Sequence, residues 1–297
     1  TLGISNNDFV RTTDERHKVV VREVLQQLYD ADEFYQDEYV GFYSAKQEAF
    51  LNDRDRNEDG TFDSIYGEVQ ELREKNYYFK LGRHQQWLID HIEANPDFIG
   101  PKTRRNEVIS FVTGGLNDLS VSRTSFKWGV PVPDDPDHVM YVWIDALTNY
   151  ITALGYPDAE SADYKVFWPN SLHLVGKDIL RFHAVYWPAF LMAAGLEPPQ
   201  RVYAHGWWTS EGEKISKSLG NVIEPLALVE QYGLDQIRYF LLREVPFGND
   251  GDCSHRAMVG RINSELANDF GNLAQRVLSM IHKNCDARMP RPGELSG

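Results

Sequence analysis

Apolar residues recur at helical spacing near the start of the chain. Residues 14–28 place them on one helix face, with Thr13 or Asp14 as the cap, and residues 9–13 before them favour a short strand. The apolar positions of the predicted helix are Val19, Val20, Val24, Leu25 and Leu28. We therefore expect a strand that leads into an amphipathic helix.

From residue 139 onward, apolar runs that read as buried strands alternate with helical patterns. We predict strands at 139–144, 172–175 and 202–205, with helices at 146–154 and 182–194 between them. This alternation indicates a parallel α/β sheet, in which ligands bind beyond the carboxyl ends of the strands. A last helix is predicted at about residues 262–281.

Residues 34–105 differ from both parts. The stretch 52–60 is charged and rich in turn-forming residues, which favours an exposed loop. Residues 68–78 and 85–93 are predicted to be a strand and a helix of a small separate unit. Pro96, Pro101 and the basic residues Lys102, Arg104 and Arg105 mark a hinge into the next part.

Composition narrows the class of protein. The 297 residues are 42% hydrophobic, enough for real cores, and the net charge is −14, so any contact with tRNA or DNA has to come from local basic patches. The two cysteines, Cys253 and Cys285, lie far apart, which fits a reducing cytosol and argues against a zinc knuckle. No apolar run is long enough to cross a membrane. We expect a cytoplasmic protein.

The residues that follow the predicted strands form the candidate site. They are Trp143, Asp145, Leu147 and Tyr150, then Gly176, Lys177, Asp178, Phe182, His183 and Trp187, then His205, Gly206, Trp207 and Trp208. An aromatic box suits a thioether, because sulfur gains from contact with ring edges, although each aromatic taken alone also fits an ordinary core. Gly176 allows a nucleotide to come close, and Asp178 can accept a ribose hydroxyl or cap the following helix.

The loop Lys214-Ile215-Ser216-Lys217-Ser218 carries two lysines three residues apart around a hydroxyl group. Such a loop can hold a polyphosphate from two sides, with Ser216 and Ser218 as short hydrogen-bond donors. A loop of this composition is, taken alone, more often solvated surface. The other candidate residues favour the phosphate site.

Taken together, these motifs resemble the methionyl-tRNA synthetases, a family of class I aminoacyl-tRNA synthetases. The stretches that carry the resemblance are 142–147, 176–179, Phe182-His183 with Trp187, the loop 214–218 with Ile215 where Met is commonest, and Gly271-Asn272-Leu273-Ala274-Gln275-Arg276. The resemblance covers essentially the whole chain. It implies an α/β fold: a Rossmann-like parallel sheet, incomplete at the N-terminus, with a small inserted connective domain and the start of an α-helical anticodon-binding bundle.

The resemblance also implies domain limits. It assigns 1–33 to the end of the first half of the nucleotide-binding fold, 34–125 to the inserted domain, and 126–208 to the second half. Residues 209–256 would be the lysine-loop and stem-contact region, and 257–297 the start of the helical bundle. The family's first signature, with two histidines, is expected upstream of Thr1 and the rest of the bundle beyond Gly297. The chain as printed should therefore be nearly inactive in adenylate formation.

The implied reaction activates methionine with Mg²⁺-bound ATP to methionyl-adenylate and then transfers it to tRNA(Met). The protein is expected to be a monomer that does not bind membranes. The implied methionine site is Trp143, Leu147, Tyr150, Phe182, His183 and Trp187, and the implied ATP site is Gly176, Asp178, His205, Trp208 and Lys217. The catalytic loop is Lys214, Ser216, Lys217 and Ser218; Asp145 and Arg123 support the site, and Asn272 and Arg276 bind the anticodon. Residues 34–105 contain no Cys, so a knuckle without zinc is expected.

Alternatives to a methionyl enzyme are other synthetases and other roles of the same fold. Synthetases for isoleucine, leucine and valine need an editing domain larger than this insert, because one methylene is worth only about 1–3 kcal/mol. A cysteinyl enzyme would be expected to carry zinc ligands that are missing here. The chain also fits a tRNA-binding fragment without catalysis, or a different class I synthetase or nucleotidyltransferase. An ion pair on the surface is the other interpretation of Arg123, and an ordinary solvated helix face that of Asn272 and Arg276.

Overall fold

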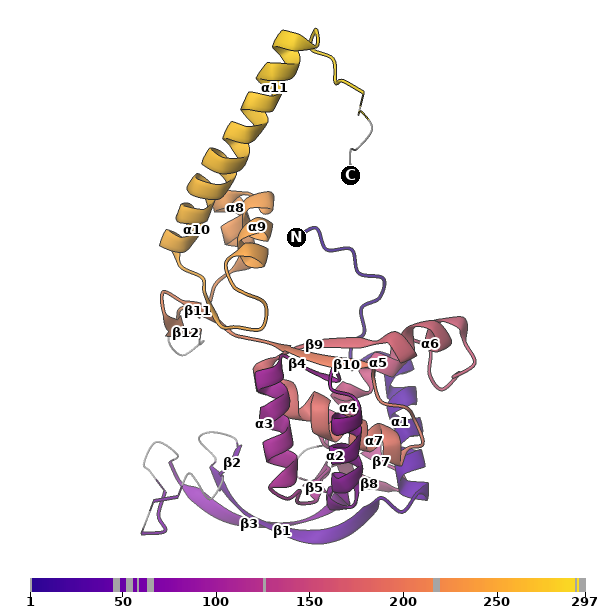
Figure 1. Ribbon diagram of the computed structural model, residues 1–297. Coiled ribbons are helices and arrows are strands. Elements are labelled where there is room, and N and C mark those ends of the chain that lie inside the picture. Colours follow the sequence, from indigo (N-terminus) through magenta and orange to yellow (C-terminus); the bar gives the residue numbers. More distant parts are fainter. Residues whose placement is uncertain are drawn as a thin grey trace. The chain divides into compact units, whose positions relative to one another are not determined.

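The computed structural model describes residues 2–44, 49–51, 56–57, 59–62, 67–124, 127–215, 220–291 and 293 (Figure 1). They form two compact units, Asn6–Ala204 and Thr1–Ser5 with His205–Gly297. Within the described residues, no helix is both long and apolar enough to span a membrane.

The first helix, α1 (Glu15–Asp30), confirms the helical pattern near the N-terminus. It buries Val20, Val24, Leu25 and Leu28, but Val19 is exposed and Val21 is buried in its place. The predicted strand at 9–13 is wrong, because these residues form no strand. The backbone N–H of Arg11 instead donates to the carboxylate of Asp14 at the start of the helix, at 3.2 Å.

A long antiparallel hairpin lies between α1 and the next helices. β1 (Phe34–Ser44) pairs with β3 (Val69–Phe79) along its whole length, from Phe34 opposite Phe79 to Ser44 opposite Val69 (Figure 1). β2 (Ala49–Leu51) and β5 (Leu119–Ser120) complete a sheet of order β2-β1-β3-β5. β3 confirms the strand predicted at 68–78. The charged stretch at 52–60 falls mostly outside the described residues.

The parallel sheet has the order β4-β10-β9, with β4 (Ile99–Gly100) parallel to β10 (Arg201–His205). β9 (Leu172–Gly176) and β10 confirm two of the three predicted strands. β4 comes from the hinge of the predicted insert and joins this sheet. Gly100 is required there, because a Cβ atom at this position would lie 2.6 Å from the Tyr203 ring.

The strand predicted at 139–144 is wrong in its second half. The strand β8 (Asp135–Met140) ends at Met140, before the second half of the predicted range. It pairs antiparallel with β6 (Ser122–Arg123) and β7 (Pro131–Val132), outside the parallel sheet. Tyr141 is the N-cap of α4 (Val142–Leu147), which is followed by α5 (Asn149–Thr152). A short apolar run has no period that separates a buried strand from a buried helix.

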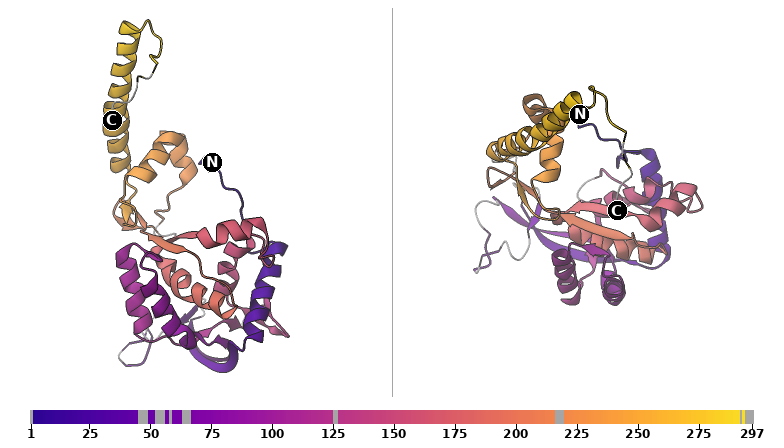
Figure 2. Two further views of the ribbon diagram at one scale, coloured as in Figure 1. Left: turned by 45° about the vertical axis from the view of Figure 1, so that its right-hand side comes forward. Right: turned by 45° about the horizontal axis from the view of Figure 1, so that its top comes forward.

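The remaining helices cover the parallel sheet and its connections. They are α2 (Gln85–Ala94), α3 (Lys102–Thr113), α6 (Ala162–Phe167), the π-helix Phe182–Tyr186 and α7 (Trp187–Ala193), with 3₁₀ turns at Leu81–His84, Trp168–Asn170 and Lys177–Ile179. α2 and α3 pack side by side in every view (Figure 2). Helices were predicted at 85–93 and 182–194, and the structure confirms both.

The other unit has its own small sheet and core. β11 (Trp208–Ser210) lies between β12 (Glu213–Lys214) and β13 (Gly251–Asp252). α8 (Pro225–Tyr232) and α9 (Leu234–Arg243) precede a run of helix formed by α10 (His255–Arg261), the π-helix Ile262–Gly271 and α11 (Asn272–Asn284). Its core is Ile237, Phe240 and Met258. The helix predicted at 262–281 is confirmed, whereas the five domain limits stay predictions.

Candidate active site

Five of the predicted methionine-site residues gather in one aromatic cluster inside the unit 6–204. The Trp143 ring on α4 stacks on Phe182, with centroids 3.8 Å apart, and meets His183 edge-on at 6.3 Å. The ring centroid of Tyr150 on α5 lies 6.5 Å from that of Trp187 on α7. Leu147 is buried on α4 in the same core. Ring pairs of this kind stabilise by about 0.5–1.5 kcal/mol beyond their buried area.

The hydrogen bonds of His183 define which of its nitrogens carries the proton. Burial lowers the pKa of His183, so the ring is neutral at neutral pH. Its Nδ1 lies 2.9 Å from the carbonyl oxygen of Ile179, which can only accept, so Nδ1–H donates there. Nε2 then accepts from the Tyr150 hydroxyl at 2.8 Å. Burial raises the pKa of Tyr150 to about 12, which keeps this donor protonated.

His173 on β9 is a member of the cluster that was not predicted from the sequence. Its ring stacks on Tyr150 at 3.8 Å, and its Nε2 accepts from Nε1–H of Trp187 at 3.2 Å. Burial, and to a smaller extent the nearby His183, lower the pKa of His173 to about 3. The alternation of strand residues was the sequence signal that could have placed His173 in the core. In β9, His173 and Val175 are buried while Leu172 and Leu174 are exposed.

The two buried histidines keep the cluster free of charge. The rings of His173 and His183 lie with centroids 6.2 Å apart, and two imidazolium ions at that distance inside a core would repel each other. Since both pKa values are lowered, the cluster contains histidines but no charged ring at neutral pH. It combines hydrogen-bonded rigidity with an apolar surface. That combination suits recognition of an uncharged group better than a purely aliphatic core of the same size.

A cavity of about 820 Å³ opens on the side of the cluster formed by Tyr150 and His173. Its wall also includes Leu154, Trp168 and Leu172. The space therefore lies beside uncharged rings, and it presents them to any ligand that enters. Asp8 and Asp163 also line this cavity, so a ligand that enters meets two carboxylates as well as the uncharged rings.

The two predicted support residues have well-defined partners. Asp145 is buried and accepts from Nε2 of His17 on α1 at 2.7 Å. Arg123 on β6 donates to the Ser120 hydroxyl at 2.7 Å and the Ser122 carbonyl at 2.6 Å, and its guanidinium lies 5.2 Å from the Tyr141 ring centroid. His17 was the second functional candidate missed, although it occupies the buried stripe of α1.

The predicted nucleotide-site residues lie at strand ends. Gly176 is the last residue of β9, Asp178 lies exposed in the turn that follows, and His205 is the last residue of β10. Trp208 on β11 lines a cavity of about 240 Å³ with His205 and Gly206. A Cβ atom at Gly206 would meet the Asn249 carbonyl at 2.1 Å, so only glycine fits beside that loop.

The lysine loop and the two residues predicted to bind the anticodon belong to the unit that contains residues 205–297. Lys214 ends β12, whereas Ser216, Lys217 and Ser218 lie outside the described residues. Asn272 and Arg276 are both exposed and four residues apart on α11, so they share one face of the helix. Phe270 and Leu273, two apolar residues of the same run of helix, are exposed as well.

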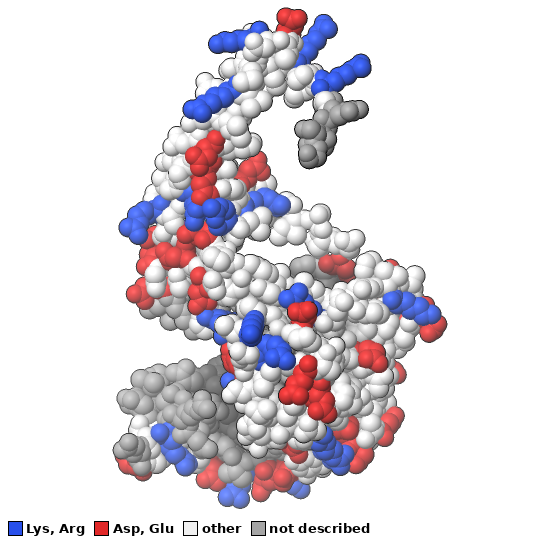
Figure 3. Space-filling view, viewed as in Figure 1, with Lys and Arg blue, Asp and Glu red and all other residues white. Residues whose placement is uncertain are grey.

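No group of three or more His, Cys, Asp or Glu side chains within the described ranges is placed to hold a metal ion. The expectation of a knuckle without zinc stays a prediction. In the space-filling view, Lys and Arg gather at the far end of α11 (Figure 3). Residues 272–291 contain Arg276, Lys283, Arg288 and Arg291 with a single acidic residue, Asp286.

The parallel pairing of β4 with β10 and the buried aromatic cluster belong to an α/β protein, a class in which ligands bind at the carboxyl ends of the strands. The chain matches the family model described as tRNA synthetases class I (M) over residues 1–61 and 59–278. It therefore belongs to that family, and its fold is the class I synthetase fold predicted from the sequence.

Two relatives illustrate the similarity. The chain is 55% identical to the methionine–tRNA ligase of Mycobacterium tuberculosis and 54% identical to that of Mesorhizobium japonicum, in each case over 99% of this chain and 57% of the relative. A crystal structure of the M. tuberculosis methionyl-tRNA synthetase bound by methionyl-adenylate has a TM-score of 0.89 at 54% identity, over 99% of this chain and 59% of that one. The chain thus spans little more than half the length of these relatives.

The neutral state of His173 predicts an acid-sensitive fold. The unfolded chain takes up a proton at His173 near the ordinary histidine pKa of 6.5, whereas the folded chain does so only near a pKa of about 3. Between these values the unfolded state binds more protons, so this contribution to stability is complete above pH 6.5 and is lost as the pH falls. His173→Gln should flatten the dependence by up to about 1.4 kcal/mol per pH unit.

Urea unfolding at a series of pH values between about 4 and 6 measures this slope. His282→Gln is the matched control, because His282 is exposed on α11. It should leave the slope unchanged. A His173→Gln protein with the slope of the unsubstituted chain would contradict the assignment.

Proposed function

We propose that this chain is part of a methionine–tRNA ligase, which activates methionine with ATP and transfers it to tRNA(Met) for translation. The aromatic cluster carries the proposal, because the residues assigned to methionine meet there in a chain 55% identical to such ligases. The similar structure bound by methionyl-adenylate supports ATP as the second substrate. The expected cytoplasmic location and monomeric state stay predictions.

The methionine side chain would lie among Trp143, Tyr150, Phe182, His183 and Trp187, with Leu147 beneath. Tyr150 and His173 are both uncharged at neutral pH, because their pKa values are about 12 and about 3. Neutral rings suit a thioether, whose sulfur gains about 0.3–1.5 kcal/mol from an aromatic contact. A charged side chain in the same position would lose its hydration without a compensating partner.

In the proposed first step, the methionine carboxylate attacks the α-phosphorus of ATP. The bond from this phosphorus to the bridging oxygen of the β-phosphate breaks, so pyrophosphate leaves and methionyl-adenylate forms. Lys217 would stabilise charge on the leaving phosphates, while Lys214, Ser216 and Ser218 shape the loop. Gly176, Asp178, His205 and Trp208 would hold the nucleotide, with Arg123 and Asp145 as support. Such catalysis is mostly positioning and charge stabilisation.

In the second step, a terminal ribose hydroxyl of tRNA attacks the activated carbonyl and AMP leaves. Asn272 and Arg276 would contact the anticodon, since an amide can bond a base edge and a guanidinium can also stack on an unpaired base. The local cations of residues 272–291 favour this role in a chain whose net charge is −14. Mg²⁺ would accompany ATP as part of the substrate.

The methionine assignment is tested by Trp143→Ala in the intact protein. The methionine KM in pyrophosphate exchange should rise about 30-fold. This corresponds to a loss of roughly 2 kcal/mol of binding free energy, the scale of losing a buried aromatic contact. Trp87→Ala is the control, because Trp87 on α2 also stacks on a histidine, His91, away from the cluster. Equal effects of both substitutions would remove Trp143 from the site, and exchange that does not depend on methionine would reject the function.

The anticodon assignment is tested by Asn272→Ala and Arg276→Ala. Each should weaken aminoacylation of tRNA(Met) by roughly 1–3 kcal/mol, the scale of one base contact, and leave methionine-dependent exchange without tRNA unchanged. Gln275→Ala and Lys165→Ala are the controls, an exposed amide on the same helix and an exposed cation on α6, outside the basic stretch 272–291. The assignment is wrong if the controls lower charging as much, or if exchange falls in parallel.

A further inference from the structure

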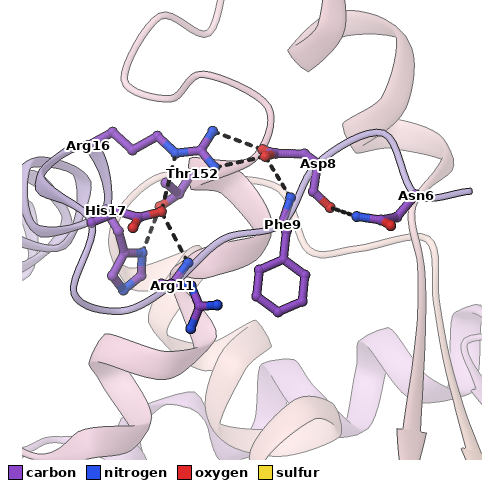
Figure 4. Close-up of polar contacts among 8 residues, drawn as sticks. Asn6, Asp8, Phe9, Arg11, Arg16, His17 and Thr152 are labelled. Carbon is purple, nitrogen blue, oxygen red and sulfur yellow. Dashed lines mark hydrogen bonds and ion pairs between the residues drawn. The ribbon is translucent and has the colours of Figure 1, made fainter. Parts of the chain in front are cut away.

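His17 makes a buried polar connection between α1 and the helices that carry the proposed methionine site. The ring is fully buried, and its Nε2 lies 2.7 Å from Oδ1 of Asp145. Its Nδ1 lies 3.0 Å from Oγ1 of Thr152 (Figure 4). Asp145 belongs to α4 and Thr152 to α5. One side chain therefore attaches two consecutive helices to a third.

The same network continues along the inner side of α4 and α5. Oγ1 of Thr152 donates to the Thr148 carbonyl at 3.0 Å, and Oγ1 of Thr148 donates to the Ile144 carbonyl at 2.8 Å. One ring nitrogen of His17 thus faces the Asp145 carboxylate, and the other faces the Thr152 hydroxyl, which can donate or accept.

Helical periodicity places the methionine residues on the opposite side of these helices. Residues two apart on an α-helix lie about 200° apart around its axis, and residues four apart share a face. Asp145 faces α1, so Trp143 and Leu147, two residues to either side of it, face away. Tyr150 is related in the same way to Thr148 and Thr152.

We propose that His17 is a positioning residue for the methionine site. By holding Asp145 and Thr152, it sets the rotation of α4 and α5 and so directs Trp143, Leu147 and Tyr150 toward Phe182 and His183. The aromatic contacts alone constrain these helices from one side, since Trp143 stacks on Phe182 and Tyr150 donates to His183. The polar network constrains them from the other side. The inference rests on the proposed function for its ligand.

The chain offers a matched control in a second buried pair. Nε2 of His84 lies 2.9 Å from Oε2 of Glu33, and both side chains are mostly buried. His84 ends a 3₁₀ turn and stacks on Phe79, and neither it nor Glu33 belongs to α4 or α5. A substitution at His84 therefore disrupts a comparable pair without touching the helices of the site.

The experiment compares His17→Gln with His84→Gln in the intact protein. His17→Gln should raise the methionine KM roughly 3- to 30-fold, the range over which residues outside a site alter binding, with the ATP KM changed less than about twofold. His17→Phe, which keeps no donor, should have a larger effect than His17→Gln. His84→Gln should lower the unfolding free energy but leave the methionine KM within about twofold.

A second measurement needs no methionine. Hydrogen–deuterium exchange of residues 142–152 should be faster in His17→Gln than in the unsubstituted protein, and unchanged in His84→Gln. If His17→Gln does not fold, Thr152→Val removes only the partner of Nδ1 and should raise the methionine KM in the same direction by a smaller factor.

Two results would overturn the positioning role. One is that His17→Gln has the same methionine KM as the unsubstituted protein. Where His17→Gln does not fold, the same KM in Thr152→Val has this meaning. The other is the same rise in His84→Gln, which would mean a general effect of stability. Failure of the proposed function appears separately, as an unsubstituted protein that shows no methionine-dependent pyrophosphate exchange. In that case the hydrogen–deuterium exchange of residues 142–152 alone decides whether His17 positions the helices.

Discussion

The need of buried polar rings for hydrogen-bond partners determines how the aromatic cluster is arranged. Nε1–H of Trp187 can only donate, so His173 has to present an unprotonated nitrogen to it. His183 has to donate to the Ile179 carbonyl, which leaves its other nitrogen for the Tyr150 hydroxyl. These bonds join β9, α5 and the helix 182–193 in one arrangement, since an unpaired polar group there would cost about 1–3 kcal/mol.

Much of the fold could be predicted from the sequence, because many elements are long or strongly periodic. α1, β3, α2, β9, β10, the helix that begins at residue 182 and the helix that begins at about residue 262 were all expected. The error at residues 142–144 arose because Val142, Trp143 and Ile144 form a continuous apolar run, which fits a buried strand and a buried helix equally. Phe9 favoured a strand by its type, yet it is exposed and pairs with no other strand.

The candidate site was predictable where a side chain is unusual for its type and missed where a polar residue occupies a core position. Trp143, Tyr150, Phe182 and Trp187 were recognised as a set from their order along the chain. His17 and His173 were missed, because a histidine on a buried stripe is indistinguishable in sequence from one that merely packs. Their partners, Asp145 and Trp187, lie 128 and 14 residues away, and no local pattern reports such distances.

The π-helical turn at Phe182–Tyr186 shows how backbone geometry serves this polar network. A π turn shifts hydrogen bonding from i+4 to i+5 and changes which carbonyl groups the helix itself uses. The carbonyl of Ile179, just before the turn, accepts from Nδ1–H of the His183 side chain at 2.9 Å. The Ile179 carbonyl therefore fixes the tautomer of His183, and the tautomer in turn makes Nε2 the acceptor for Tyr150. The π turn begins at Phe182 and contains His183, so the backbone path that brings this ring to the Ile179 carbonyl also determines which acceptor the Tyr150 hydroxyl meets.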